Sequence, residues 1–178
     1  RAMGLLDVPD QPLLLEALRH GPPSDRSRDV SAVLDLMVHD LDLALSISAG
    51  DPVTAEGEGH RVDGVWDVAR SEVSFDQGFT AIFDVSRQAA ERKRLMRVVY
   101  PSGEVEIDFM ARSFRNTTPF TLNPDFADTP AGKDPLAASV EGFLKAVRGE
   151  APRPVVTADE AIRALDLAIA VEQGLTAS

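Results

Sequence analysis

Residues 95–109 read Leu-Met-Arg-Val-Val-Tyr-Pro-Ser-Gly-Glu-Val-Glu-Ile-Asp-Phe and contain two apolar runs on either side of a turn. The first run spans 95–100, and in the second Val105, Ile107 and Phe109 alternate with acidic residues. Pro101-Ser102-Gly103 between the runs has the composition of a tight turn. Alternation with a period of two is typical of a half-buried strand, so the stretch predicts a β-hairpin.

A second hairpin precedes this one along the chain. The run 73–75 leads into Asp76-Gln77-Gly78, another tight-turn sequence, and residues 79–85 then alternate apolar and polar side chains. Further strands are expected at 11–18 and 53–62. Consecutive hairpins predict one mostly antiparallel sheet of about six strands, with one face more apolar than the other.

Helical patterns surround these strands. A helix is expected at 31–48, and Asp134-Pro135 and Thr157 with Glu160 have the composition of two further helix starts. The fold class is therefore α+β, one large sheet with helices packed on one face. The helix beginning at 135 carries Leu136, Val140, Phe143, Leu144 and Val147 on one face, and the expected buried face of the last helix consists of Ile162, Leu165 and Ile169.

Composition restricts the classes of function. The 178 residues carry a formal net charge of −11, which disfavours nucleic acid and anionic membranes as partners because both would repel the chain. The chain has no cysteine, so disulfides and thiolate metal sites are excluded and a reducing, cytoplasmic setting is expected. No apolar run approaches the ~20 residues of a membrane span. Because the sequence starts at Arg1, we expect it to be a piece of a longer protein.

The helix expected at 31–48 carries a narrow line of ionisable groups. Asp35, His39, Asp42 and Ser46 are spaced i, i+4, i+7 and i+11, so they share one wedge roughly 60° wide. Almost all the other residues of this helix are apolar, with Asp40 the exception. Burial of carboxylates costs free energy unless they are paired, so this wedge should face a partner or a wet cleft.

Two interpretations fit this spacing. Asp35 and His39 can form an i, i+4 pair that merely satisfies a helix surface. Alternatively, a carboxylate one turn from an imidazole can orient it for general acid–base catalysis on a substrate hydroxyl. Helix geometry leaves both open. A metal site on Asp35, His39 and Asp42 is less favoured, because the chain has only three histidines and no second metal-type motif.

The segment Asp35-Leu-Met-Val-His39-Asp40-Leu-Asp42 resembles the D-x-x-x-H-x-x-D helix in the C-terminal domain of the Gfo/Idh/MocA family of nicotinamide-dependent sugar oxidoreductases. Similarity extends to Glu16–Pro22, Ala69–Phe75, Ser86-Arg87 and Pro154–Ala161, so it covers nearly the whole chain. The resemblance implies a fold like the C-terminal domain of glyceraldehyde-3-phosphate dehydrogenase.

The resemblance also implies roles for individual residues. His39 is implied to exchange a proton with the sugar hydroxyl, with Asp35 as its partner. Asp42 falls on the second acidic position of the motif. Two roles are open for a residue there, contact with the substrate and a structural hydrogen bond. Arg19 and Arg28 are candidate substrate ligands, with plain surface charge as the alternative. This form of the helix is similar to that of family members acting on nucleotide-activated amino sugars.

The motifs of a nucleotide-binding half are missing from the sequence. It contains no G-x-G-x-x-G and no Glu-Lys-Pro, which in the family supplies a catalytic lysine. We therefore expect residues 1–178 to be a single C-terminal substrate-binding and dimerisation domain. NAD or NADP would be bound mainly by an absent N-terminal dinucleotide-binding domain, with no cofactor-binding residues here, and this piece alone would be inactive.

The resemblance implies a sugar or nucleotide-sugar substrate and a homodimer or tetramer formed through the open face of the sheet. Strands 79–85 and 105–109 are expected to offer apolar side chains to that contact. Two alternatives remain open: a non-catalytic sugar- or nucleotide-sugar-binding module, and a purely structural dimerisation domain.

Overall fold

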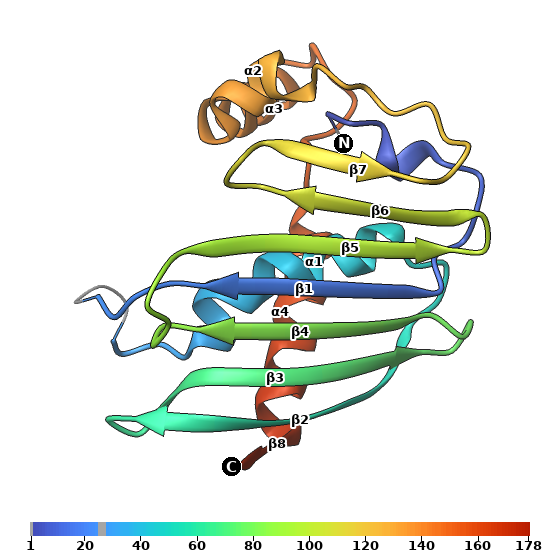
Figure 1. Cartoon of the computed structure of the whole chain (residues 1–178). Helices are drawn as coiled ribbons and strands as arrows, with labels where there is room; N and C mark the ends of the chain where they lie inside the picture. Colours follow the sequence, from blue (N-terminus) through green and yellow to red (C-terminus); the bar gives the residue numbers. More distant parts are fainter. Residues whose placement is uncertain (1, 25–27) are drawn as a thin grey trace.

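The computed structural model describes residues 2–24 and 28–178, which form one eight-stranded mixed sheet with helices on one face (Figure 1). The strand order is β7-β6-β5-β1-β4-β3-β2-β8. The strands are β1 (Leu14–His20), β2 (Pro52–Val62), β3 (Val65–Phe75), β4 (Thr80–Ser86), β5 (Lys93–Tyr100), β6 (Gly103–Asp108), β7 (Ser113–Asn116) and β8 (Leu175–Ala177).

Both predicted hairpins are confirmed, as β3–β4 and β5–β6, and so is the α+β fold class. The sheet is larger than the expected six strands, since β7 and β8 are too short to give a periodic pattern. Two neighbouring pairs, β1–β4 and β2–β8, are parallel, and the remaining pairs are antiparallel. Strand β1 lies in the middle of the sheet, between β4 and β5.

The glycine at position 57 shows how closely β2 packs between β3 and β8. Gly57 lies opposite Leu175 of β8, and a Cβ at this position would come within 2.3 Å of the Arg70 carbonyl oxygen and 3.0 Å of the Leu175 side chain. Only glycine therefore fits where the end of the last helix and β8 pack against β2.

The core lies between the sheet and two helical segments. A π-helical turn (Val33–Met37) leads into α1 (Val38–Ile47), and α4 (Ala158–Gly174) packs beside them. The largest fully buried side chains include Leu15, Phe83, Val98, Met37 and Leu41, which come from alternate strand positions and from the inner side of the helical segment. These apolar side chains define the helix-covered face of the sheet.

The expected buried face of the last helix is wrong. In α4 the buried residues are Ala164, Leu167, Ala168 and Val171, whereas Ile162, Leu165 and Ile169 are 54%, 46% and 40% exposed. Ala164 and Ala168 on the inner side let α4 approach α1 and β2 closely. The face that carries these small residues is therefore the one that is buried. The larger aliphatic side chains are left outside.

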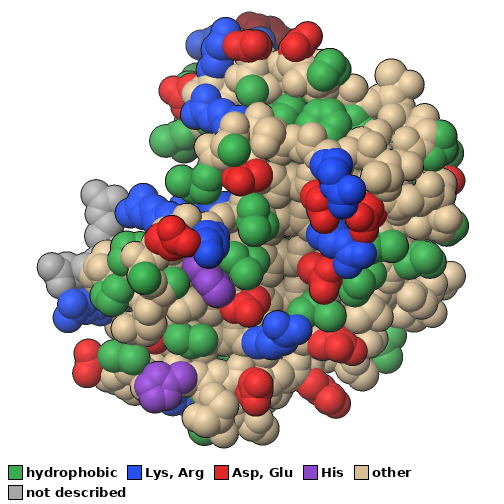
Figure 2. All heavy atoms as spheres, viewed as in Figure 1, with side chains coloured by type: hydrophobic (Ala, Val, Ile, Leu, Met, Phe, Trp, Pro, Cys, Tyr) green, Lys and Arg blue, Asp and Glu red, His purple; other side chains and the backbone are tan. Residues whose placement is uncertain are grey.

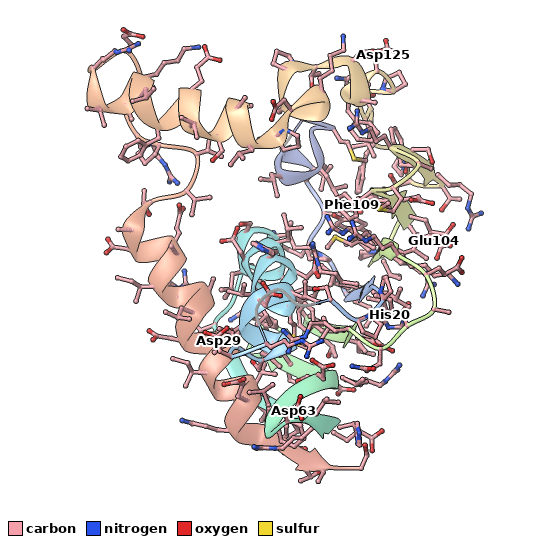
Figure 3. The ribbon with its side chains drawn as sticks, turned by 90° about the vertical axis from the view of Figure 1, so that its left-hand side faces the viewer. His20, Asp29, Asp63, Glu104, Phe109 and Asp125 are labelled. Carbon is pink, nitrogen blue, oxygen red and sulfur yellow. The ribbon has the colours of Figure 1, made fainter. Side chains whose placement is uncertain are left out.

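A second helical unit stands clear of the sheet. It comprises the short turns η3 (Phe126–Asp128) and α2 (Pro130–Lys133) and the longer α3 (Pro135–Val147), while a further turn, η1 (Leu5–Asp7), precedes β1. Figure 3 shows α3 projecting beyond the sheet and joined by a connecting segment to α4. None of its residues is buried, and its apolar stripe is open to solvent at Leu136, Val140, Phe143, Leu144 and Val147.

The opposite face of the sheet has no helix over it and is coated with charged side chains interspersed with apolar ones (Figure 2). Along the described parts of the chain, no helix is both long and apolar enough to cross a membrane.

Candidate functional site

The helix that carries the candidate catalytic residues begins with a π-helical turn, which the sequence did not predict. The Val38 N–H donates to the Val33 carbonyl, five residues earlier, and the Ser31 hydroxyl accepts from the Leu34 N–H at 3.1 Å. A π turn holds more residues than an α turn, so Asp35 and His39 are not stacked as an i, i+4 pair of a regular α-helix would be. Such turns occur frequently at functional sites.

Asp35 faces a buried arginine, not His39. Arg87, just after β4, places Nη1 3.8 Å from Asp35 Oδ2 and donates from Nε to Asp67 Oδ1 at 2.6 Å. Gln88 donates from Nε2 to the other oxygen of Asp67. Arg87 is thus held between β3 and the π turn with a carboxylate on each side, and Asp35 remains one-third exposed.

His39 is exposed on the side of the helical segment away from the sheet. Within residues 2–24 and 28–178 its side chain makes no hydrogen bond or ion pair, so it is not joined to Asp35 in this structure. The exposed imidazole of His39 is available to a ligand that approaches α1 from outside. The acid–base role of the two residues stays a prediction.

Arg19 lies on the helix-covered face, where it binds the one acidic residue that interrupts the apolar side of α1. Its Nε and Nη2 each donate to Asp40 at 2.8 Å, and the two side chains are 15% and 5% exposed. This bidentate pair anchors α1 to β1. Two N–H groups of the Arg19 guanidinium are therefore already bound to Asp40. The structure favours an anchoring role for Arg19 over the substrate contact suggested by its position in the sequence.

The other two candidate ligands lie at different places. Arg28 is exposed and donates from Nε to the Ser24 carbonyl at 3.3 Å, beside a small cavity of about 100 Å3 that Asp67 and Arg87 also line. Asp42 is half-buried on α1, where its backbone carbonyl accepts from the Ser46 hydroxyl at 2.8 Å. The structure therefore brings Asp35 together with Arg87 and brings Arg28 to the same end of the sheet.

Sequence reasoning missed Asp40, Asp67 and Arg87 as parts of this region. For Asp40 a signal existed, because it was the single charged residue among apolar neighbours outside the predicted wedge. Asp67 and Arg87 meet only through the β3–β4 pairing, which joins residues twenty positions apart. In the part of the chain that is described, no group of three or more His, Asp or Glu side chains is placed to hold a metal ion.

A dinucleotide does not fit the glycine cluster of β2. Gly57-Glu58-Gly59 is the densest glycine cluster, but it lies within β2, where Gly57 and Gly59 pack against neighbouring strands and Glu58 adds negative charge. A pyrophosphate needs free backbone N–H groups at the turn between a strand and a helix.

Comparison with known proteins places this arrangement in a family. Residues 16–107 match the GFO/IDH/MocA C-terminal domain. A UDP-N-acetylglucosamine 3-dehydrogenase from Acidithiobacillus ferrooxidans is 33% identical over 149 residues, which cover 79% of this chain and 48% of that protein. The chain thus spans about half the length of this relative.

Solved structures agree with this relationship. A crystal form of the Acidithiobacillus ferrooxidans enzyme superposes with a TM-score of 0.79 at 26% identity, over 95% of this chain and 55% of that one. The WlbA dehydrogenase from Chromobacterium violaceum, solved with NADH and UDP-GlcNAcA, shares the fold with a TM-score of 0.74 at 15% identity, over 92% of this chain and 52% of that one. The chain therefore belongs to the GFO/IDH/MocA family, of which it contains the C-terminal domain.

Proposed function

We propose that this chain is the substrate-binding half of a cytoplasmic NAD(P)-dependent dehydrogenase that oxidises a hydroxyl group of a nucleotide sugar. The observation that carries the proposal is the exposed His39 on α1, four residues after an Asp35 that a buried arginine holds in place. The UDP-N-acetylglucosamine 3-dehydrogenase relative supports the class of substrate. In the alternative, the chain is a non-catalytic module that binds the same nucleotide sugar but does not oxidise it.

In this proposal the chain binds the sugar and moves one proton. The substrate hydroxyl lies against the outer side of α1, and His39 accepts its proton as the alcohol becomes a carbonyl. Asp35, four residues before His39, contributes negative charge on the same helical segment as the imidazolium that forms, and Arg87 and Asp67 fix the position of Asp35. The hydride that leaves the same carbon would be accepted by NAD(P), which in this proposal is held by a separate nucleotide-binding half.

The exposed apolar residues of α3 and α4 support a second half that packs against these helices. Phe143 is 56% exposed and Leu136 76%, and monomeric proteins rarely leave such a stripe open. The beginning of the described chain lies close by, because the Asn123 N–H donates to the Met3 carbonyl at 3.0 Å just before α2 and α3 (Figure 1). A nucleotide-binding half joined through residue 2 would therefore emerge beside α3.

The proposed activity is tested by joining the nucleotide-binding half of the Acidithiobacillus ferrooxidans relative to residue 2 of this chain. With NAD or NADP we expect this protein to form reduced cofactor with UDP-N-acetylglucosamine and not with the free sugar or with inositol, measured as absorbance at about 340 nm. The 178-residue chain alone should show no turnover. Binding of the nucleotide sugar without cofactor reduction, in a protein that still binds NAD, would favour the non-catalytic module.

We also propose that two copies of the chain associate through the open face of the sheet. The expectation that 79–85 and 105–109 expose apolar side chains there is wrong in detail, because Phe83, Val85, Val105 and Ile107 face the helices and are buried. The open face instead carries a ladder of ion pairs along a groove of about 630 Å3. Its members, with contacts of 2.7–2.9 Å, are Glu16, Arg97, Glu104, Arg115 and Glu106.

The ladder contains both signs of charge side by side, so a second copy related by a two-fold axis can set its acidic side chains against the basic side chains of the first. We expect light scattering at micromolar concentration to give the mass of a dimer. Ile82→Arg in the groove should give a monomer, and Ile162→Arg on the outer side of α4 should leave the dimer intact. A monomeric wild-type chain would contradict the proposal.

A further inference from the structure

At one end of the sheet, two arginines and a phenylalanine form a row on the helix-covered face. Arg19 of β1 lies directly opposite Arg94 of β5. The Phe109 N–H donates to the Arg94 carbonyl at 3.0 Å, which extends the β5–β6 ladder one residue past Asp108. Side chains directly opposite in neighbouring strands lie on the same face, so all three share the face on which Arg19 meets α1.

The row has an excess of positive charge. Arg19 is neutralised by Asp40. Arg92 directly precedes β5 and lies against Gly21, just past the end of β1, and neither it nor Arg94 makes an ion pair within the described ranges. Partial burial and the guanidinium groups of Arg19 and Arg92 lower the pKa of Arg94, although Asp40 acts in the opposite direction. Two neighbouring cations without an ion pair give this end of the sheet local positive charge in a chain of net charge −11, and they make it suited to an anion.

An aromatic ring lies next to these cations. Phe109 is 39% exposed and the following Met110 is 52% exposed, so neither contributes to the core. Figure 3 looks onto this end of the sheet, where Phe109 is labelled. Guanidinium groups bind phosphates with two parallel hydrogen bonds, and exposed aromatic rings stack on nucleobases.

We propose that Arg92, Arg94 and Phe109 bind the nucleoside diphosphate part of the substrate, with the two guanidinium groups on the diphosphate and the ring on the base. The inference rests on the proposed function for the class of ligand. Arg19 and Asp40 connect the row to α1, and His39 directly precedes Asp40. The proposal places the diphosphate between Phe109 and α1, with the attached sugar continuing past α1 to its outer side, where His39 is exposed.

The test uses the 178-residue chain and three probes in titration calorimetry: UDP, inorganic pyrophosphate and uridine. Arg94→Gln should weaken binding of UDP and of pyrophosphate by about tenfold or more, because a charge-assisted contact is lost. Phe109→Leu keeps an apolar side chain and removes the aromatic ring. It should weaken the binding of UDP by about fivefold or more and leave the binding of pyrophosphate unchanged. Arg163→Gln, which removes an exposed arginine from α4, is the matched control and should bind all three probes normally.

Equal affinity of wild type, Arg94→Gln and Phe109→Leu for UDP would overturn the inference, and so would the absence of UDP binding up to about 5 mM. The outcome is separable from that of the proposed function. The two variants could lose UDP binding selectively while the joined enzyme oxidises no nucleotide sugar. That result would support the binding site and reject the proposed reaction. Turnover of UDP-N-acetylglucosamine with an unchanged KM in both variants would reject the binding site alone.

Discussion

Replacing His39 with alanine in the joined two-half enzyme is expected to lower kcat by about 10²-fold to 10⁴-fold, the range typical for loss of a general base. KM for the nucleotide sugar should change much less, because the imidazole contributes in the transition state and the nucleotide is held elsewhere. His39 is exposed and has no described hydrogen-bond partner, so its removal should leave the fold intact. Steady-state kinetics with saturating NAD(P), together with a thermal unfolding curve, measures both effects.

His60→Ala is the matched control for this experiment. His60 is an exposed histidine on β2, at the far side of the sheet from β5, and its removal should leave kcat unchanged. Asp35→Asn is expected to lower kcat less than His39→Ala, since Asp35 acts through charge and not through a direct hydrogen bond to the imidazole. Turnover of His39→Ala close to that of wild type would remove His39 from the mechanism.

Asp40→Ala is expected to destabilise the chain by about 3–5 kcal/mol, the usual cost of removing one partner of a buried ion pair. The substitution leaves the largely buried Arg19 without its carboxylate and adjacent to a second guanidinium, Arg94. For a domain of this size the loss corresponds to a decrease in Tm on the order of 10 °C. Circular dichroism during heating, or a urea titration, measures it.

Asp128→Ala provides the comparison for Asp40→Ala. Asp128 also pairs with a cation, Lys133, but at 3.5 Å and with its side chain 79% exposed. Exposed ion pairs contribute about 0–1 kcal/mol, so this variant should unfold near the wild-type temperature. Similar losses for both aspartates would show that the burial of the Arg19–Asp40 pair adds nothing to stability.

The sequence was sufficient for the parts of the fold that depend on local patterns. Alternation around Pro101-Ser102-Gly103 predicted the β5–β6 hairpin, and the capping residues Thr157 and Glu160 predicted the start of α4. Each of these signals lies within a few residues of the structure that it specifies. The position of β1 between β4 and β5 carries no such local signal, since parallel pairing with β4 is decided by the assembled sheet.

The candidate site was predictable in composition and not in geometry. The spacing of Asp35, His39 and Asp42 predicted a helix that the structure contains, yet a π turn changes how Asp35 lies relative to His39. Nothing in the spacing of side chains distinguishes a π turn from an α turn, because the difference is a backbone adjustment to packing. Substrate contact and plain surface charge were both open for Arg19 because its partner, Asp40, is 21 residues away and becomes a neighbour only when α1 packs on the sheet.

The central position of β1 also determines the order in which the sheet can assemble. Strands β2–β3–β4 and β5–β6–β7 are each consecutive antiparallel neighbours, so both groups close short loops, whereas Leu14 of β1 finds its partners only at Thr80 and Val99. Closing these long loops costs more chain entropy, so β1 should join last and unite two preformed halves of the sheet. Pulse-labelled hydrogen exchange during refolding would then show late protection of β1. Because Arg19 belongs to this strand, the anchor of α1 and the continuous sheet form in the same step.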